Sequence, residues 1–255
     1  MRILYRSLLA TTLLATSLAA SASDFSFFSL LAEEIHIPEH TITFAFIALL
    51  ITVAAIVYRL KLSKVQNIAL PDKGVSFRNL IEVYGEFIYS KCVSIIGEKE
   101  GPKHFWFIAA IFLIILSSNL IGLIPGFLPP TANFNTTFAL GLLAFFYYTL
   151  YGCKTKGVIG YFKHFMGPLW YMAILLFPIE LVSDFIRPLT LAVRLRGNMF
   201  GDHLVLGVFT ELTHYIIPVV FLFFGLLVSF VQAFVFCILT MVYISLAIGH
   251  GESEH

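Results

Sequence analysis

Residues 169–209, LWYMAILLFPIELVSDFIRPLTLAVRLRGNMFGDHLVLGVF, form the most informative segment of this chain. It is compatible with a single helix, which at 1.5 Å per residue would be about 60 Å long. A second such stretch, residues 216–249, would be about 50 Å long. Both exceed the roughly 30 Å hydrocarbon core of a bilayer. Each must therefore tilt steeply or break into two short spans, which Pro188 and Pro218 would allow. We expect two long, steeply tilted helices.

The composition places the chain in a membrane. Of its 255 residues, 59% are hydrophobic and only 12% are charged, whereas soluble domains carry about 25% charged residues. Several apolar runs reach the roughly 20 residues that a helix needs to cross a bilayer. The net charge of +1, without a basic cluster interleaved with aromatic residues, gives no indication of nucleic-acid binding. We therefore expect an all-α membrane protein in contact with the lipid bilayer.

The first part of the chain divides into segments of different character. Residues 1–22 resemble a secretory signal peptide, because Arg2 and Arg6 precede a short apolar run that ends in a small-residue cleavage site. An uncleaved extra helix is the alternative for this segment. Residues 23–40 form an acidic and aromatic lead-in, which we expect to be periplasmic. Residues 41–255 form a single membrane domain.

Apolar runs bounded by charged or proline-rich segments predict the helices of this domain. Three runs are expected to cross the membrane, at residues 41–60, 105–124 and 136–153. Residues 71–101 carry apolar side chains at helical spacing with charged ones between them, which predicts an amphipathic helix on the cytoplasmic membrane surface. With the two long stretches, this gives about five membrane-embedded helices and one amphipathic helix.

The basic residues indicate the orientation in the membrane. Of the 16 Lys and Arg residues, two lie in the signal-like segment and three in residues 187–196, and the remaining eleven follow the first or the third crossing. Because positively charged loops stay in the cytoplasm, these segments are predicted to be cytoplasmic. The chain would then be a multi-pass protein of a bacterial inner membrane, with a periplasmic N-terminus and a cytoplasmic C-terminus.

Residues 169–209 carry many polar and charged side chains for a membrane segment. These side chains recur every three or four residues and therefore share one helical face about 30 Å long. Charged groups at membrane depth cost several kcal/mol each and normally mark an ion path or a partner. The face includes Glu180, Asp184, Arg187, Arg194, Asn198 and Asp202.

Pairing between these groups is a simpler explanation, because polar groups can hold membrane helices together. Asp184 lies four residues after Glu180 and three before Arg187, so pairing within the helix is plausible for Arg187. Arg194 has no acidic residue three or four positions away on either side. Pairing alone therefore leaves Arg194 unexplained.

The residues around Arg194 resemble a known signature. The run LAVRLRGNM, Leu191–Met199, is similar to the Leu-x-x-Arg-Leu-x-Gly-Asn-Met signature of subunit a of F-type ATP synthases, of the bacterial type. Glu180 stands fourteen residues before Arg194, where this family commonly has a carboxylate. The resemblance covers roughly residues 37–245. Further family-like residues are Asn119 in the run NLIGLIP, Gln232-Ala233-Phe234, Thr240 and Val242-Tyr243.

The resemblance implies a mechanism of proton translocation. Protons would pass between two aqueous half-channels by way of carboxylates on a rotating c-ring, with Arg194 facing the ring and separating the half-channels. A guanidinium keeps its proton in a protein, so Arg194 could attract a ring carboxylate but could not relay a proton. Glu180 would line the inner half-channel and His203 the outer one, about 21 Å and about 13 Å from Arg194 along the helix. Further candidates are Asn198, Asp202 and Gln232, and secondary ones are Asp184, Arg187, Tyr243 and Asn119.

Several positions depart from the family pattern. His203 stands where many bacterial relatives have glutamate, Asp202 where glycine is common, and Gly225 where some relatives place a histidine. We interpret Asp202 and His203 as a compensating relay pair. Arg196 replaces a usual aromatic residue and lies about 200° around the helix from Arg194, so we expect it to face elsewhere.

The resemblance also implies the partners, which are the c-ring, the subunit b peripheral stalk and the rest of the ATP synthase complex. The sequence has no phosphate-binding loop, paired catalytic acids, metal-ligand cluster or cofactor motif. ATP chemistry would therefore occur on other subunits, and the chain would not be an enzyme alone. A self-contained proton-coupled secondary transporter is the main alternative, although the chain shows no internal repeat. A scaffold of ion-paired helices would not explain a polar stripe that spans the membrane.

Overall fold

The computed structural model describes residues 28–29, 34, 36–63, 76–124, 127–158, 160–161, 173–212 and 216–249. In this part of the chain the regular structure is helical, without a strand, which confirms the prediction of an all-α protein. The signal peptide predicted for residues 1–22 lies outside the described residues. The helices are α3 (Glu39–Leu62), α4 (Phe77–Ile96), α5 (Gly101–Ile121), the short 3-10 helix η1 (Pro130–Ala132), α6 (Phe134–Lys156), α8 (Ala173–Leu212) and α9 (Ile216–Ile248).

Capping residues explain where two of the shorter helices begin. Ser76 caps α4, because its hydroxyl accepts a hydrogen bond from the backbone N–H of Asn79 at 3.2 Å. Asn133 caps α6 in the same way and accepts from the N–H of Asn135 at 2.9 Å. Two lysines lie in the last turn of α6, where positive charge favours the helix dipole. The three apolar runs predicted to cross the membrane are thus found as α3, α5 and α6, with ends that differ by up to four residues.

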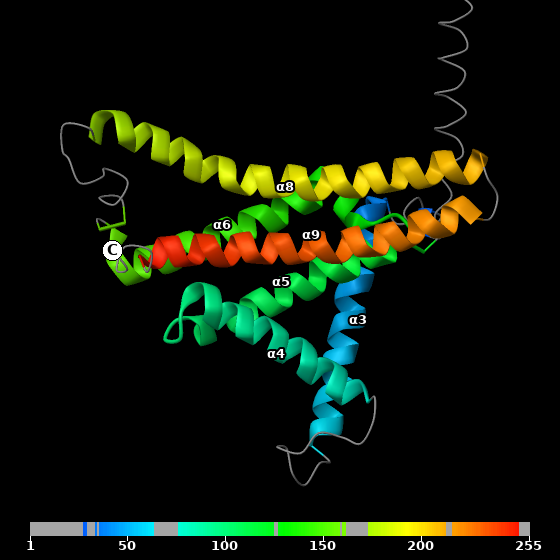
Figure 1. Ribbon diagram of the computed structural model, residues 1–255, viewed down its shortest axis with the longest axis horizontal. Helices are drawn as coiled ribbons and strands as arrows, with labels where there is room; N and C mark the ends of the chain where they lie inside the picture. The colour runs from blue at the N-terminus through cyan, green and yellow to red at the C-terminus, as the bar shows by residue number, and fades with distance from the viewer. Residues whose placement is uncertain are drawn as a thin grey trace, which may run out of the picture.

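The two long stretches each form one continuous helix, α8 of 40 residues and α9 of 33 residues. At 1.5 Å per residue they are about 60 Å and about 50 Å long, and neither is broken into two spans. They lie side by side along the long axis of the molecule (Figure 1). Near their connection, the rings of Phe209 and Phe221 stack at 4.5 Å between centroids. The prediction of two long helices is therefore confirmed, with α8 shifted by up to four residues from its expected ends.

The hydrophobic core lies between α8 and α9 on one side and α4, α5 and α6 on the other. Both α5 and α6 contact α9, α6 also contacts α8, and α4 packs on α5 and α9 (Figure 1). In contrast, α3 crosses the other helices steeply and has only two buried residues, Thr43 and Ile47. The large buried apolar side chains include Ile88, Phe112, Tyr148, Leu195, Met199, Phe236 and Met241.

Four of the described helices are long and apolar enough to cross a membrane: α3, α5, α6 and most of α9 (Val219–Ile248). α8 is not among these four, and its charged side chains lower its hydropathy relative to α9. Length and apolar composition in this number of helices define a multi-pass membrane protein.

The helix predicted within residues 71–101 is α4, and it packs closely against the bundle. The side that faces α5 and α9 buries Ile88 and Cys92. Other parts of its surface, including Leu80 and Val83, are exposed. The face of α4 that meets the other helices is therefore narrower than its apolar stripe.

Candidate functional site

A buried ridge fixes how α8 is rotated about its own axis. Pro188, Leu191, Leu195 and Met199 follow one another at steps of three or four residues, and all four are buried. Both α6 and α9 contact α8. The ridge faces these helices, whereas Val193 and Arg194, which lie between its members, are exposed.

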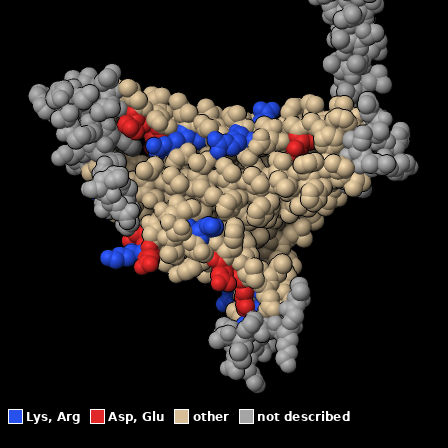
Figure 2. Space-filling view, in the orientation of Figure 1, with Lys and Arg blue, Asp and Glu red and all other residues tan. Residues whose placement is uncertain are grey.

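Arg194 comes directly before Leu195 of this ridge and is exposed. Among the described residues, it has no ion-pair or hydrogen-bond partner. Figure 2 shows charged groups spaced along α8 on a face that is otherwise largely uncharged. A guanidinium without a counter-ion is unfavourable in apolar surroundings. Within the described part of the chain, Arg194 thus lacks a partner of opposite charge.

Two further charged side chains of α8 are exposed, Glu180 and Arg196. Within the described part of the chain, Glu180 has no hydrogen bond or ion pair. The guanidinium of Arg196 lies over the ring of Phe134, at the start of α6, 5.9 Å from its centroid. Arg196 therefore contacts α6, and the expectation that it faces away from Arg194 agrees with this geometry.

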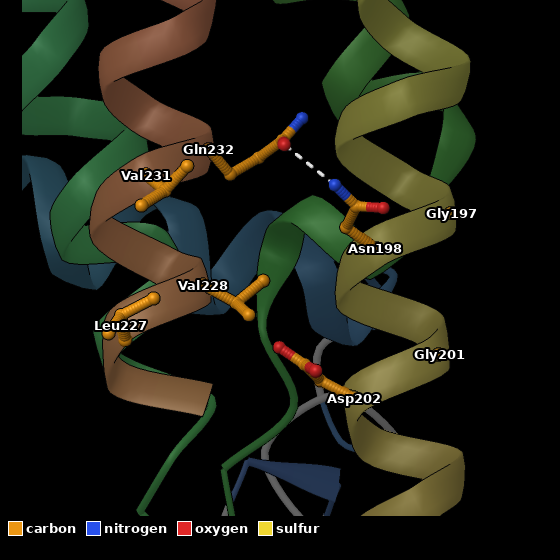
Figure 3. Close-up of a pocket in the computed structure, with 8 residues that line it drawn as sticks. All are labelled: Gly197, Asn198, Gly201, Asp202, Leu227, Val228, Val231 and Gln232. Atoms are coloured by element: carbon orange, nitrogen blue, oxygen red, sulfur yellow. Dashed lines mark hydrogen bonds between the residues drawn. The ribbon is translucent and has the colours of Figure 1, made fainter. Parts of the chain in front are cut away.

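A groove of about 460 Å³ runs between α8 and α9 (Figure 3). Gly197, the first residue of α8 that lines it, comes three residues after Arg194. Gly197 and Gly201 leave room on the α8 side, because they carry no side chain. Across the groove, the side-chain amide of Asn198 donates to Oε1 of Gln232 at 2.6 Å. The groove is lined by Gly197, Asn198, Gly201 and Asp202 of α8 and by Leu227, Val228, Val231 and Gln232 of α9. The structure thus brings three of the predicted path residues together in one groove.

Asp202 and His203 face different neighbours. The side chain of Asp202 points toward α9 (Figure 3), and a Cβ placed on Gly225 would lie 4.0 Å from its Oδ2. Among the residues that the structure describes, this buried oxygen has no hydrogen-bond partner. His203 points toward the end of α5, where a Cβ placed on Gly122 would lie 2.8 Å from its Nε2. Two glycines therefore leave the space in which these two side chains lie.

Asp184 and Arg187 form an ion pair in the first half of α8, before Arg194. The Arg187 guanidinium donates to Asp184 Oδ1 at 2.8 Å, and Asp184 is only 4% exposed. The hydroxyl of Tyr148 on α6 lies within hydrogen-bond distance of the same oxygen, at 3.1 Å, and of the backbone oxygen of Asp184, at 3.4 Å. The ring of Tyr243 on α9 lies 5.0 Å from the guanidinium. The pairing that the sequence spacing allowed for Arg187 is thus present, and it joins α6, α8 and α9.

Asn119 belongs to a separate polar cluster near the end of α5. Its side chain accepts a hydrogen bond from the Thr131 hydroxyl at 2.8 Å and donates to the backbone carbonyl of Ser229 at 3.4 Å. All three residues are buried. The cluster connects α5, η1 and α9, and nothing in the sequence pattern indicated the part that Ser229 plays in it.

The polar stripe predicted on one face of α8 divides into an exposed part and a buried part. Glu180, Thr190 and Arg194 are exposed, whereas Asp184 is buried against α6 and Arg187 is partly buried. The division arises because the α6 contact covers part of the stripe. Among the described residues, no three His, Cys, Asp or Glu side chains lie close enough to hold a metal ion.

An all-α membrane bundle with a polar groove between two long helices, next to an arginine that has no partner among the described residues, fits the class of ion-translocating membrane subunits. The sequence model of the family described as "ATP synthase A chain" matches residues 40–245, and the chain belongs to this family. It is therefore a proton-translocating component of the membrane sector of an ATP synthase and not an enzyme by itself.

Relatives named ATP synthase subunit a support the same assignment. The protein of Geobacter sulfurreducens is 42% identical over 229 residues, which cover 90% of this chain and 96% of the relative. That of Bdellovibrio bacteriovorus is 44% identical over 76% of this chain and 84% of the relative. That of a Sulfurihydrogenibium species is 47% identical over 69% of this chain and 84% of the relative. Membership of this family favours a subunit of a larger complex over a self-contained transporter or a plain scaffold.

Proposed function

We propose that this chain is the stator part of a rotary proton path, in which Arg194 separates two half-channels and faces carboxylates on a rotating c-ring. The observation that carries the proposal is the exposure of Arg194 without a partner among the described residues. A carboxylate on a neighbouring subunit supplies the missing counter-ion. Because a guanidinium stays protonated, Arg194 attracts the deprotonated carboxylate and blocks direct proton passage between the half-channels.

The outer half-channel comprises the groove between α8 and α9. Asn198, Asp202 and Gln232 line this groove, and His203 lies one residue beyond it on α8. His203 is about 13 Å from Arg194 along the helix. An imidazole suits a proton relay, because its ordinary pKa lies near neutrality. Asp202 occupies the space left beside Gly225, where it acts with His203 as a relay pair.

The inner half-channel contains Glu180, on the other side of Arg194. Glu180 is exposed on α8 and lies about 21 Å from Arg194 along the helix axis. The two half-channels therefore end on opposite sides of Arg194. The buried pair of Asp184 and Arg187 lies between Glu180 and Arg194 and joins the helices there.

The partners of this subunit are the c-ring, the subunit b peripheral stalk and the rest of the ATP synthase. The excess of basic residues after the first and third crossings supports a periplasmic N-terminus and a cytoplasmic C-terminus in a bacterial inner membrane. The steep tilt of α8 and α9 follows from their length, since both are far longer than the roughly 30 Å hydrocarbon core.

Substituting the two neighbouring arginines separately tests the role of Arg194. In inverted membrane vesicles that contain the assembled ATP synthase, Arg194→Ala is expected to abolish ATP-driven proton pumping, because the separation of the half-channels is lost. Arg196→Ala is the matched control, since its side chain contacts Phe134 instead, and it should retain most of the pumping. Equal loss of pumping in both variants, at equal amounts of assembled complex, would reject Arg194 as the separating cation.

A further inference from the structure

Pro188 interrupts the hydrogen bonds of α8 in the middle of the helix. Proline has no backbone N–H, so the carbonyl of the residue four positions earlier loses its normal helical donor. In α8 that residue is Asp184, which is buried. Within a membrane, a backbone carbonyl without a donor is unfavourable, and neighbouring helices commonly supply the missing group. The carbonyl of Asp184 therefore needs a donor from another element.

Tyr148 of α6 lies where such a donor is needed. Its hydroxyl lies 3.4 Å from the backbone oxygen of Asp184 and 3.1 Å from the side-chain Oδ1 of the same residue. The tyrosine side chain is 1% exposed, so water does not compete for the hydroxyl. Tyr148 is thus positioned to satisfy the carbonyl that Pro188 leaves without a partner.

Gly141 of α6 allows the backbones of α6 and α8 to approach each other closely at Pro188. It lies seven residues before Tyr148, which puts the two on one face of α6. A Cβ placed on Gly141 would lie 2.6 Å from the carbonyl oxygen of Pro188, so any larger residue would push the helices apart. Gly141 and Tyr148 therefore contact two successive turns of α8, at Pro188 and at Asp184.

We propose that Tyr148 is a positioning residue, which donates to the proline-freed carbonyl of Asp184 and, together with Gly141, fixes the direction that α8 takes at Pro188. Unsupported prolines kink helices by 20° or more. Arg194 lies six residues beyond Pro188, or about 9 Å along the helix, so a bend of about 20° would move it by about 3 Å. The consequence for proton coupling rests on the proposed role of Arg194, whereas the effect on helix packing does not.

The ion pair offers a competing explanation for Tyr148. Because its hydroxyl also lies near Asp184 Oδ1, Tyr148 could act only by orienting the carboxylate that pairs with Arg187. The two explanations predict different results when Pro188 is substituted. Restoring a backbone N–H at position 188 gives the Asp184 carbonyl a donor within α8, but it leaves the carboxylate unchanged.

The experiment is a cycle of Tyr148→Phe, Pro188→Ala and the double variant in the complete ATP synthase. Two quantities are measured: the temperature at which this subunit dissociates from the purified complex, and the protons pumped per ATP hydrolysed in inverted vesicles. Tyr148→Phe alone should lower both, with the coupling ratio reduced at least about threefold. The double variant should behave like Pro188→Ala, because the new N–H replaces the lost hydroxyl. Impairment of the double variant equal to that of Tyr148→Phe, or no effect of Tyr148→Phe, would overturn the proposal.

Two further variants make the result specific. Tyr147→Phe removes a neighbouring hydroxyl that contacts His104 on α5 at 2.9 Å, so Pro188→Ala should not rescue it. Tyr148→Phe should also remain harmful in an Asp184→Asn background, in which the backbone carbonyl persists and the carboxylate is absent. Loss of its effect there would show that Tyr148 acts through the carboxylate. If Arg194 has no role in coupling, the dissociation temperature still decides the packing proposal.

Discussion

The environment of His203 depends on the absence of a side chain at Gly122. A Cβ at this position would lie 2.8 Å from His203 Nε2 and 2.7 Å from Pro129. Pro129 cannot retreat freely because proline is rigid, so the imidazole of His203 must give way. We therefore predict that Gly122→Ala displaces the imidazole of His203 and lowers ATP-driven proton pumping at least about tenfold, which is about 1.4 kcal/mol in the barrier.

Gly85→Ala is the matched control for this substitution. A Cβ on Gly85 would meet its nearest neighbour, the ring of Phe105, at an ordinary 3.8 Å. Alanine also favours a helix over glycine by roughly 0.5–1 kcal/mol, so Gly85→Ala should leave pumping and assembly intact. Normal pumping by Gly122→Ala, in vesicles with the same amount of complex, would mean that the position of His203 is not critical.

The sequence allowed prediction of some of these residues and not of others. The spacing of Asp184 and Arg187 predicted their ion pair because both lie on neighbouring turns of one helix. Arg194 was identified by its signature. Gly122 lies in the family-like run NLIGLIP, but its contact with His203 had no signal in the sequence, and neither did the contact of Tyr148 with Asp184. Both contacts join residues far apart in the chain. A single tyrosine in a chain with 11 Tyr and 27 Phe is not distinctive in the sequence.

At the scale of the helices, length and apolar composition were sufficient to predict α3, α5, α6, α8 and α9. These properties are local, so they can be read from consecutive residues. The packing of α4 was harder to predict, since its apolar stripe is wider than its contact with α5 and α9. Leu80 is exposed for this reason. Which part of an apolar stripe is covered depends on the neighbouring helices and not on the stripe itself.

The reactivity of Cys92 tests the packing of α4. Its thiol is fully buried against the bundle, and this burial raises its pKa to about 11. At pH 8 it should carry over a hundredfold less thiolate than an ordinary cysteine with a pKa near 8.5. Labelling with a maleimide should therefore stay slow from pH 7 to pH 9 and rise only as the pH approaches 11.

A cysteine on the exposed side of the same helix provides the comparison. Ser90 of α4 is exposed, so the thiol of a Ser90→Cys variant should be labelled rapidly at pH 8. Mass spectrometry of the labelled peptides distinguishes this thiol from Cys92. Labelling of both thiols at similar rates would show that α4 does not stay packed on α5 and α9.

At the scale of the whole molecule, the chain is a bundle whose two longest helices leave one charged face uncovered. α8 carries exposed Glu180 and Arg194 together with many exposed apolar side chains. Apolar side chains can face lipid, but an unpaired guanidinium is poorly accommodated there. This asymmetry explains why the chain is expected to conduct protons only next to a partner that supplies carboxylates.

Passive proton flux through the reconstituted membrane sector tests this account most directly. Vesicles under an applied potential would contain the wild-type chain with subunit b, either with or without the c-ring subunits. The account predicts rapid flux only when the ring is present, because the ring carboxylates carry protons between the half-channels. Flux of equal size without the ring, or flux that requires a co-transported solute, would contradict the stator function proposed for this chain.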